Sequence, residues 1–166
     1  MAQNLLKGKR GIIFGALDEN SIAWKVALAA HEQGAIFTLT NAPVALRLGE
    51  INKLAEITGA KVIPADATLV EDLEKLVTES QALLGGKLDF ILHSVGMSPN
   101  VRKGKVYTDL NYEWLQKTLD ISAISLHKVL QVCHKNDALN EWASVVALTY
   151  IAAQRAFPGY GDMADA

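Results

Sequence analysis

The feature that most constrains the fold of this chain is an alternation between short apolar runs and longer helical patterns. The apolar runs occupy residues 11–14, 35–40, 61–64, 88–93 and 143–148. Glycine, proline or a helix-capping residue separates each run from the helical pattern beside it. Such alternation is the sequence form of repeated βαβ units, which build a parallel sheet.

Helical patterns fill the intervals at 22–30, at about 44–57, at 70–84 and from 112 to about 135. The apolar runs between them are nearly continuous, without the in-and-out alternation of a half-exposed sheet, so helices should cover both faces. We therefore expect the α/β class, with a doubly wound, Rossmann-like parallel sheet. Its crossovers should be right-handed, and ligands should bind at the carboxyl ends of the strands.

Size and composition limit the remaining possibilities. The chain has 166 residues, half of them apolar, which suits one domain over 1–166 and is too short for two. A net charge of −2 with dispersed basic residues argues against a nucleic-acid partner. No apolar run approaches the ~20 residues of a membrane span. Cys133 stands alone and the four histidines lack metal-ligand spacing, so we expect no metal site and a reducing, cytoplasmic location.

The first candidate site is the turn between the first strand and the first helix, where backbone N–H groups and the helix dipole can receive a pyrophosphate. The turn does not follow the Gly-x-Gly-x-x-Gly pattern. Gly15 would allow close approach, and a longer loop then ends at Ser21. Ser21 can cap the helix and also donate its hydroxyl to a phosphate oxygen. A purely structural turn explains this loop equally well.

Two further candidates follow the third and fourth strands. Residues 93–97 read His-Ser-Val-Gly-Met, and Gly96 would let a ligand approach the backbone closely. Asp66 is placed to accept a hydrogen bond from an adenine amino group. The alternative for Asp66 is a cap on the helix that begins near Val70, and spacing alone favours that cap.

Two tyrosines, Tyr150 and Tyr160, follow the fifth strand. A phenol at this position can donate a proton or a strong hydrogen bond to a developing oxyanion on a carbonyl or enolate. Without further context, tyrosines beside the Phe-Pro-Gly sequence at 157–159 are more often half-buried packing residues. The pattern alone leaves both interpretations open.

Taken together, these motifs resemble the bacterial enoyl-[acyl-carrier-protein] reductases of the FabI type, within the short-chain dehydrogenase/reductase superfamily. The resemblance covers essentially the whole chain. Ordinary superfamily members carry Tyr-x-x-x-Lys, but in this chain Ala164, not a lysine, lies four residues after Tyr160. The enoyl reductases instead use Tyr-x6-Lys. The segments that carry the resemblance are Gly15 with Ser21-Ile22-Ala23-Trp24, His93-Ser94-Val95-Gly96, Leu148-Thr149-Tyr150 and Pro158-Gly159-Tyr160-Gly161-Asp162-Met163.

The resemblance implies an NADH-dependent enzyme that reduces trans-2-enoyl thioesters on acyl-carrier protein during fatty-acid elongation. It assigns Tyr160 to the thioester carbonyl and the enolate, and Tyr150 to the acyl site. Met97 and Met163 would contact substrate. We also include Thr40, at the end of the second strand, among the expected cofactor-binding residues. That set is Gly15, Ala16, Ser21, Ile22, Thr40, Asp66, Ala67, Ser94, Val95 and Gly96.

Further expectations concern the cofactor and the assembly. A cation just after the second strand usually selects the 2′-phosphate of NADPH. Residues 40–43 include no lysine or arginine, and the first cation after the strand is Arg47. This absence predicts a preference for NADH. The helix at 112–135 would pack against its counterpart in a homotetramer, as is common in this superfamily. The lysine of Tyr-x6-Lys would fall beyond Ala166. We therefore expect 1–166 to be the amino-terminal part of a longer enzyme, with the carboxyl-terminal part of the domain absent, and to be inactive alone.

Two alternatives remain on the sequence alone. One is another short-chain reductase that acts on a ketone, which the missing Tyr-x-x-x-Lys disfavours. The other is a nucleotide-binding module without catalysis, because a fold does not fix a function.

Overall fold

The computed structural model describes residues 4–166, and its centre is a five-stranded parallel sheet in the order β3-β2-β1-β4-β5. This arrangement confirms the expected Rossmann-like fold. The chain adds strands outward from β1 in one direction and then, at β4, in the other. The resulting switch point lies between β1 and β4, where ligands of such sheets bind beyond the carboxyl ends of the strands. The strands are β1 Arg10–Phe14, β2 Ile36–Thr40, β3 Lys61–Val62, β4 Leu88–His93 and β5 Leu139–Ala147.

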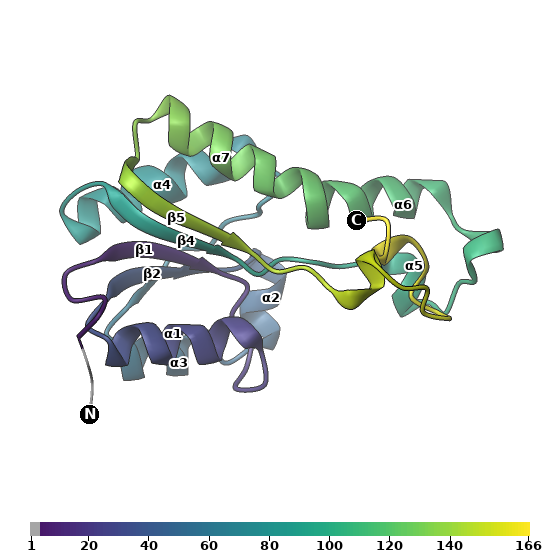
Figure 1. The fold of residues 1–166 in the computed structure, drawn as a ribbon, viewed down its shortest axis with the longest axis horizontal. Coiled ribbons are helices and arrows are strands. Elements are labelled where there is room, and N and C mark those ends of the chain that lie inside the picture. Colours follow the sequence, from purple (N-terminus) through teal and green to yellow (C-terminus); the bar gives the residue numbers. More distant parts are fainter. Residues whose placement is uncertain (1–3) are drawn as a thin grey trace.

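Helices cover both faces of the sheet (Figure 1). On one face lie α1 (Ile22–Glu32) and α3 (Ile51–Thr58), and on the other lie α4 (Val70–Leu84) and α7 (Ser125–Lys135). Because successive side chains of a strand point to opposite faces, two separate cores form. Ile12 packs in the core beneath α4 and α7, together with the buried Cys133, whereas its neighbour Ile13 packs in the core beneath α1 and α3.

The prediction of a single helix over about 44–57 is wrong, because the chain forms two helices there. They are α2 (Pro43–Leu48) and α3, separated at Gly49. Gly49 has an extended backbone, with φ −110° and ψ 176°, and a Cβ at this position would lie 2.6 Å from the Leu17 carbonyl oxygen. The same oxygen accepts a hydrogen bond from the Glu50 N–H at 2.8 Å. The close approach of the loop around Leu17 therefore interrupts the helix.

Two strand boundaries differ from the expectation by more than one residue. β3 stops at Val62, before Pro64, which has no N–H to donate to a neighbouring strand. β5 begins at Leu139 instead of 143, and its register against β4 shifts between the pairs Leu88–Leu139 and Phe90–Ser144. Trp142 lies in this irregular stretch with φ 63° and a 92% exposed side chain.

The long helical pattern at 112–135 is confirmed as one continuous helical segment with a change in its middle. It consists of α6 (Tyr112–Leu119), the π-helical stretch η2 (Asp120–Ile124) and α7. A π-helical stretch inserts one extra residue into a helix and so rotates α7 relative to α6. Ser122, inside this stretch, contacts the loop after β4, and Ser125, the first residue of α7, contacts the carboxyl end of β4.

A group of short elements lies beyond the carboxyl ends of the strands (Figure 1). We call residues 98–119 the arm: it contains α5 (Pro99–Arg102), the short turn η1 (Tyr107–Asp109) and α6. The segment after β5, with the turns η3 (Ile151–Ala153) and η4 (Gly161–Met163), packs against the arm. Over residues 4–166, no helix has both the length and the apolar character needed to cross a bilayer.

Candidate functional site

Two cavities open at the carboxyl end of the sheet, and three consecutive residues, Ser94, Val95 and Gly96, line both. The first, which we call the strand cavity, has a volume of about 410 Å³ and lies among the ends of β1, β2 and β4, the loop after β3, and the arm. The second, the tyrosine cavity, has a volume of about 450 Å³ and is bordered by the segment after β5. Because they share these three residues, the two cavities adjoin at the loop after β4, beside the switch point of the sheet, and we call the pair the groove.

Gly15 lines the strand cavity, but a contact within the protein already requires a glycine there. Its φ is +87°, and a Cβ built on it would lie 1.8 Å from the Ser94 carbonyl oxygen. Its N–H donates a hydrogen bond to the Thr40 carbonyl at 3.0 Å. The loop after β1 therefore touches the loop after β4 backbone to backbone, which no other residue would allow.

Ser21 stands at the N-cap position of α1, yet the expected side-chain cap is wrong, since its hydroxyl makes no hydrogen bond to that helix. Its Oγ instead accepts a hydrogen bond from the Leu17 N–H at 3.2 Å and donates one to the Asp18 carbonyl at 2.7 Å. The hydroxyl therefore closes its own loop instead of capping the helix.

Four of the expected cofactor residues do not line either cavity: Ala16, Ser21, Ile22 and Thr40. Ala16 is fully buried, whereas the Ile22 side chain is 60% exposed. The Thr40 hydroxyl is buried and finds no hydrogen-bond partner within residues 4–166. The structure thus brings together Gly15, Asp66, Ala67, Ser94, Val95, Gly96 and Met97 around the strand cavity.

Asp66 lines the strand cavity and is not a helix cap, because the N-cap residue of α4 is Leu69. Its Oδ1 accepts hydrogen bonds from the N–H and the hydroxyl of Thr68, at 2.9 and 2.7 Å. Its own N–H donates to Asp72 Oδ2 at 2.8 Å. These contacts orient the carboxylate and leave its Oδ2 without a partner in the described part of the chain. That oxygen is available to accept a hydrogen bond from a ligand.

Gly96 borders the passage between the two cavities. A Cβ there would lie 3.0 Å from the Cε of Met163 and would narrow the passage. The neighbouring Met97 N–H donates to Ser122 Oγ at 3.0 Å, which fixes the loop after β4 to η2. Sequence reasoning missed Ser122, because a serine within a helical pattern carries no local signal of such a contact.

His93, at the end of β4, is buried and serves the fold. Its ring lies 6.0 Å from the ring of Phe14, and its Nε2 lies 2.9 Å from Ser125 Oγ. The Ser125 hydroxyl donates its single proton to the Ile121 carbonyl at 2.6 Å. In the contact between His93 and Ser125, Nε2 is therefore protonated and donates to Ser125 Oγ. Burial lowers the pKa of His93, which favours the neutral form of its ring. Burial likewise raises the pKa of the Cys133 thiol to about 11, which leaves it unreactive.

The two predicted tyrosines come together in the tyrosine cavity. Their ring centres lie 4.8 Å apart, and the ring of Tyr150 also lies 5.8 Å from that of Phe157. Tyr160 is part-buried, whereas Tyr150 is half-exposed. The rings are tilted by 42° and their contact limits the movement of both side chains, and Met163 borders the same cavity. The two rings therefore pack against each other while both residues line the cavity.

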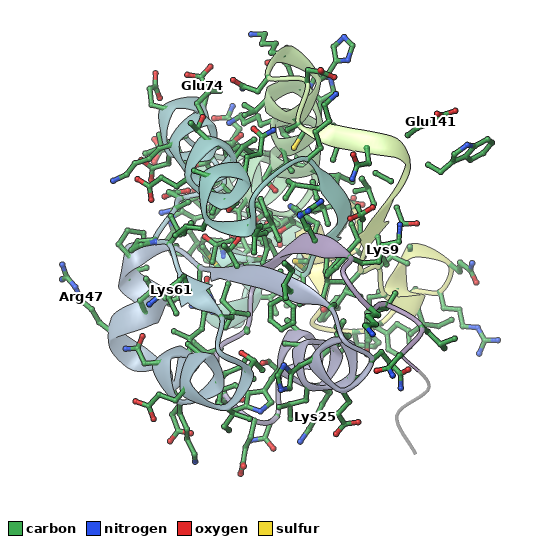
Figure 2. The ribbon with its side chains drawn as sticks, turned by 90° about the vertical axis from the view of Figure 1, so that its left-hand side faces the viewer. Lys9, Lys25, Arg47, Lys61, Glu74 and Glu141 are labelled. Carbon is green, nitrogen blue, oxygen red and sulfur yellow. The ribbon has the colours of Figure 1, made fainter. Side chains whose placement is uncertain are left out.

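Two cations that sequence reasoning missed line the strand cavity from the arm: Arg102 and Lys117. Their separation in the sequence forms no pattern, and only the fold of the arm brings them to one cavity. Arg47, the nearest cation after β2, points away from the body of the protein (Figure 2). Among residues 4–166, no group of three or more His, Cys, Asp or Glu side chains could hold a metal ion.

Comparison with known proteins agrees with this geometry. The family model described as Enoyl-(Acyl carrier protein) reductase matches residues 15–166. The chain belongs to this family. It is 63% identical to FabI from Alistipes finegoldii, whose crystal structure superposes with a TM-score of 0.95 over 98% of this chain and 62% of that one. A second structure of that protein, titled as its NADH complex, superposes with a TM-score of 0.96 over 98% of this chain and 57% of that one.

A curated relative is the Enoyl-[acyl-carrier-protein] reductase [NADH] 1 of Rhizobium meliloti. It is 33% identical over 98% of this chain and 58% of its own length. The chain thus spans about 60% of the length of the family members it matches.

The groove suits an extended ligand of the kind that this family's fold binds at its switch point. Asp66 offers an unpartnered carboxylate oxygen at one end, which fits an amino-bearing base. Arg102 and Lys117 place positive charge beside the same cavity, which fits a pyrophosphate. The adjoining cavity, which shares Gly96, holds the two tyrosines.

Proposed function

We propose that this chain is the nucleotide-binding domain of an NADH-dependent reductase that acts on trans-2-enoyl thioesters. The observation that carries the proposal is the continuity of the groove: Ser94, Val95 and Gly96 line both the cavity that holds Asp66 and the cavity that holds the two tyrosines. A ligand that spans the passage would present its reactive end directly beside Tyr150 and Tyr160. The names of the relatives, which are NADH enoyl-[acyl-carrier-protein] reductases, support the same reaction.

Tyr160 has the central part in the proposed chemistry. Bound NADH supplies the hydride that reaches the β-carbon of the enoyl group. The Tyr160 hydroxyl donates a hydrogen bond to the thioester carbonyl oxygen, where negative charge develops as the enolate forms. Tyr150, in ring contact with Tyr160, borders the acyl side of the cavity and holds the Tyr160 ring in place. Met163 gives the substrate an apolar boundary in the tyrosine cavity, whereas Met97, expected to contact substrate, lines the strand cavity instead.

Binding of the cofactor takes place at the opposite end of the groove. Asp66 accepts the hydrogen bond of the adenine amino group through its free oxygen, with Ala67 beside it. Gly15 and Ser94 border the path of the pyrophosphate, and Arg102 and Lys117 counter its charge. Four of the expected cofactor residues lie off the cavity and act on this region through the backbone that surrounds it. They are Ala16, Ser21 and Ile22, in and after the loop that follows β1, and Thr40, at the end of β2. The direction in which Arg47 points supports NADH over NADPH.

The carrier, assembly and location follow from the same proposal. The substrate is an acyl chain on acyl-carrier protein, and the enzyme works in the cytoplasm. A homotetramer would use the helical segment α6–α7, whose outer surface exposes Tyr112, Ile124 and Leu130. Sedimentation of the full-length protein tests the tetramer, and loss of tetramers on Ile124→Glu would support this surface.

The decisive experiment follows NADH oxidation with a crotonyl thioester in the full-length protein that contains this chain. Tyr160→Phe should lower kcat by at least about tenfold while the dissociation constant for NADH stays nearly unchanged, because the lost hydroxyl acts mainly on the enolate. Tyr107→Phe serves as the matched control, since this exposed tyrosine lies in the arm and lines neither cavity. Full turnover in Tyr160→Phe would remove this phenol from the mechanism.

A further inference from the structure

Asp162 is the one aspartate among residues 4–166 that is completely buried, with 0% of its surface exposed. It lies in η4, between Tyr160 and Met163, both of which line the tyrosine cavity. No lysine, arginine or histidine within residues 4–166 forms an ion pair with it. A buried carboxylate is destabilising unless hydrogen bonds satisfy it, so neutral donors must replace the missing cation.

Three neutral donors from the arm satisfy this carboxylate. Ser98 Oγ donates to Oδ1 at 2.6 Å, and Asn100 Nδ2 donates to Oδ2 at 2.8 Å. The Thr118 hydroxyl shares its single proton between Oδ2, at 2.9 Å, and the Trp114 carbonyl, at 2.8 Å. Ser98 is the N-cap of α5, Asn100 lies inside α5, and Thr118 lies in α6. One carboxylate therefore joins the segment that bears the tyrosine to two separate helices.

The donors are themselves held by the arm. Ser98 Oγ accepts the Val101 N–H at 3.0 Å, which caps α5. Asn100 binds both main-chain groups of Asn111, accepting from its N–H at 3.0 Å and donating to its carbonyl at 3.1 Å. These bonds fix the position of each donor before it meets the carboxylate. The arm thus fixes the position of η4 through these hydrogen bonds, and η4 in turn holds the arm.

We propose that Asp162 is a positioning residue that holds the Tyr160 hydroxyl at the thioester carbonyl. The proposal rests on the function proposed above. Tyr160 is two residues from the buried carboxylate and its backbone enters η4 directly. A carboxylate can accept from all three donors at once, whereas any other side chain of this size leaves at least one of them without its acceptor. Release of the segment would let the Tyr160 ring shift within the tyrosine cavity, away from its contact with Tyr150.

The test uses a double-mutant cycle in the full-length protein with NADH and a crotonyl thioester. Asp162→Ala should lower kcat by about a hundredfold, the cost of misplacing a reacting group by roughly an ångström. KM for the thioester and the dissociation constant for NADH should change little. Asp162→Asn should recover part of the lost kcat, because an amide oxygen still accepts from Asn100 and Thr118 while the Ser98 hydroxyl can rotate to accept.

Combination with Tyr160→Phe distinguishes positioning from general damage. If Asp162 acts through the Tyr160 hydroxyl, Asp162→Ala should cost little further kcat once that hydroxyl is absent. Effects that multiply in the double variant would overturn the proposal, as would wild-type kcat in Asp162→Ala. Asp109→Asn is the matched control, since it removes an exposed carboxylate from the same arm and should leave kcat unchanged.

Two further measurements keep the test decisive. If Asp162→Ala does not fold, Thr118→Val removes one donor with nearly the same shape, and it should lower kcat in part and show the same non-additivity with Tyr160→Phe. Thr118→Val with wild-type kcat would then refute the positioning role. An unaltered protein that binds NADH but reduces no enoyl thioester would refute the proposed function, and with it this role.

Discussion

Substitution of Gly15 by alanine tests whether the groove depends on contact between two loops. The backbone there has φ +87°, and the left-handed region costs a non-glycine residue about 1–2 kcal/mol. The new Cβ would also lie 1.8 Å from the Ser94 carbonyl oxygen, so the loops must separate. Overpacking of this kind typically costs a further ~1–3 kcal/mol. We therefore expect Gly15→Ala to lower the free energy of unfolding by about 2–5 kcal/mol.

Gly85→Ala is the matched control for this substitution. Gly85 has φ +76°, and a Cβ there would meet no atom within 4 Å, so only the backbone cost of about 1–2 kcal/mol applies. Urea unfolding of both variants, with m-values compared, measures the difference. Gly15→Ala should also weaken NADH binding, because Ser94 lines both cavities. Equal destabilisation of the two variants would refute the proposed contact between the loops.

Three further results are expected. Asp66→Ala should weaken NADH binding by about 10–100-fold, from the loss of one hydrogen bond to a charged group worth ~1.5–3 kcal/mol, and calorimetry showing an unchanged affinity would contradict this. Arg47→Ala should leave the ratio of kcat/KM for NADH and NADPH unchanged, because this side chain points away from the protein, and a changed ratio would show that it folds back (Figure 2). Burial lowers the pKa of His93, so its contribution to stability is complete above the unfolded-state value of 6.5 and is lost as the pH falls from there through the lower folded-state value. Thermal unfolding between about pH 7.5 and 5.5 should therefore show a smaller pH dependence in His93→Gln than in the unaltered protein, and equal slopes would exclude His93 as the cause.

The sequence predicted the fold well where the signals were local. The bounds of α4 and β4 coincide with the predicted 70–84 and 88–93, because Gly85 and Gly86 adopt the positive φ values, +76° and +153°, that end the helix. The break between α2 and α3 could not be predicted in this way. It results from the contact of Gly49 with Leu17, a residue from another loop.

The site shows the same division. Gly15, the tyrosines and the segment after β4 could be expected at the carboxyl ends of the strands, but their residue types left a structural role open, and only the family resemblance assigned them a function. Asp162 has no such signal, because an aspartate between glycine and methionine resembles an exposed loop residue. Its donors Ser98 and Asn100 lie 64 and 62 residues earlier in the chain. Burial of that carboxylate is created only when the arm folds against η4.

The π-helical stretch η2 makes the length of the segment between α6 and α7 matter more than the identity of its residues. Each residue of an α-helix turns the chain by about 100°. Deletion of the exposed Ala123 would remove the extra residue and rotate α6 relative to α7 by about that angle. Ser125 would still face His93, but Thr118 and Ser122 would turn away from Asp162 and Met97. Homologous chains should therefore tolerate substitution at 123 far more readily than a one-residue deletion.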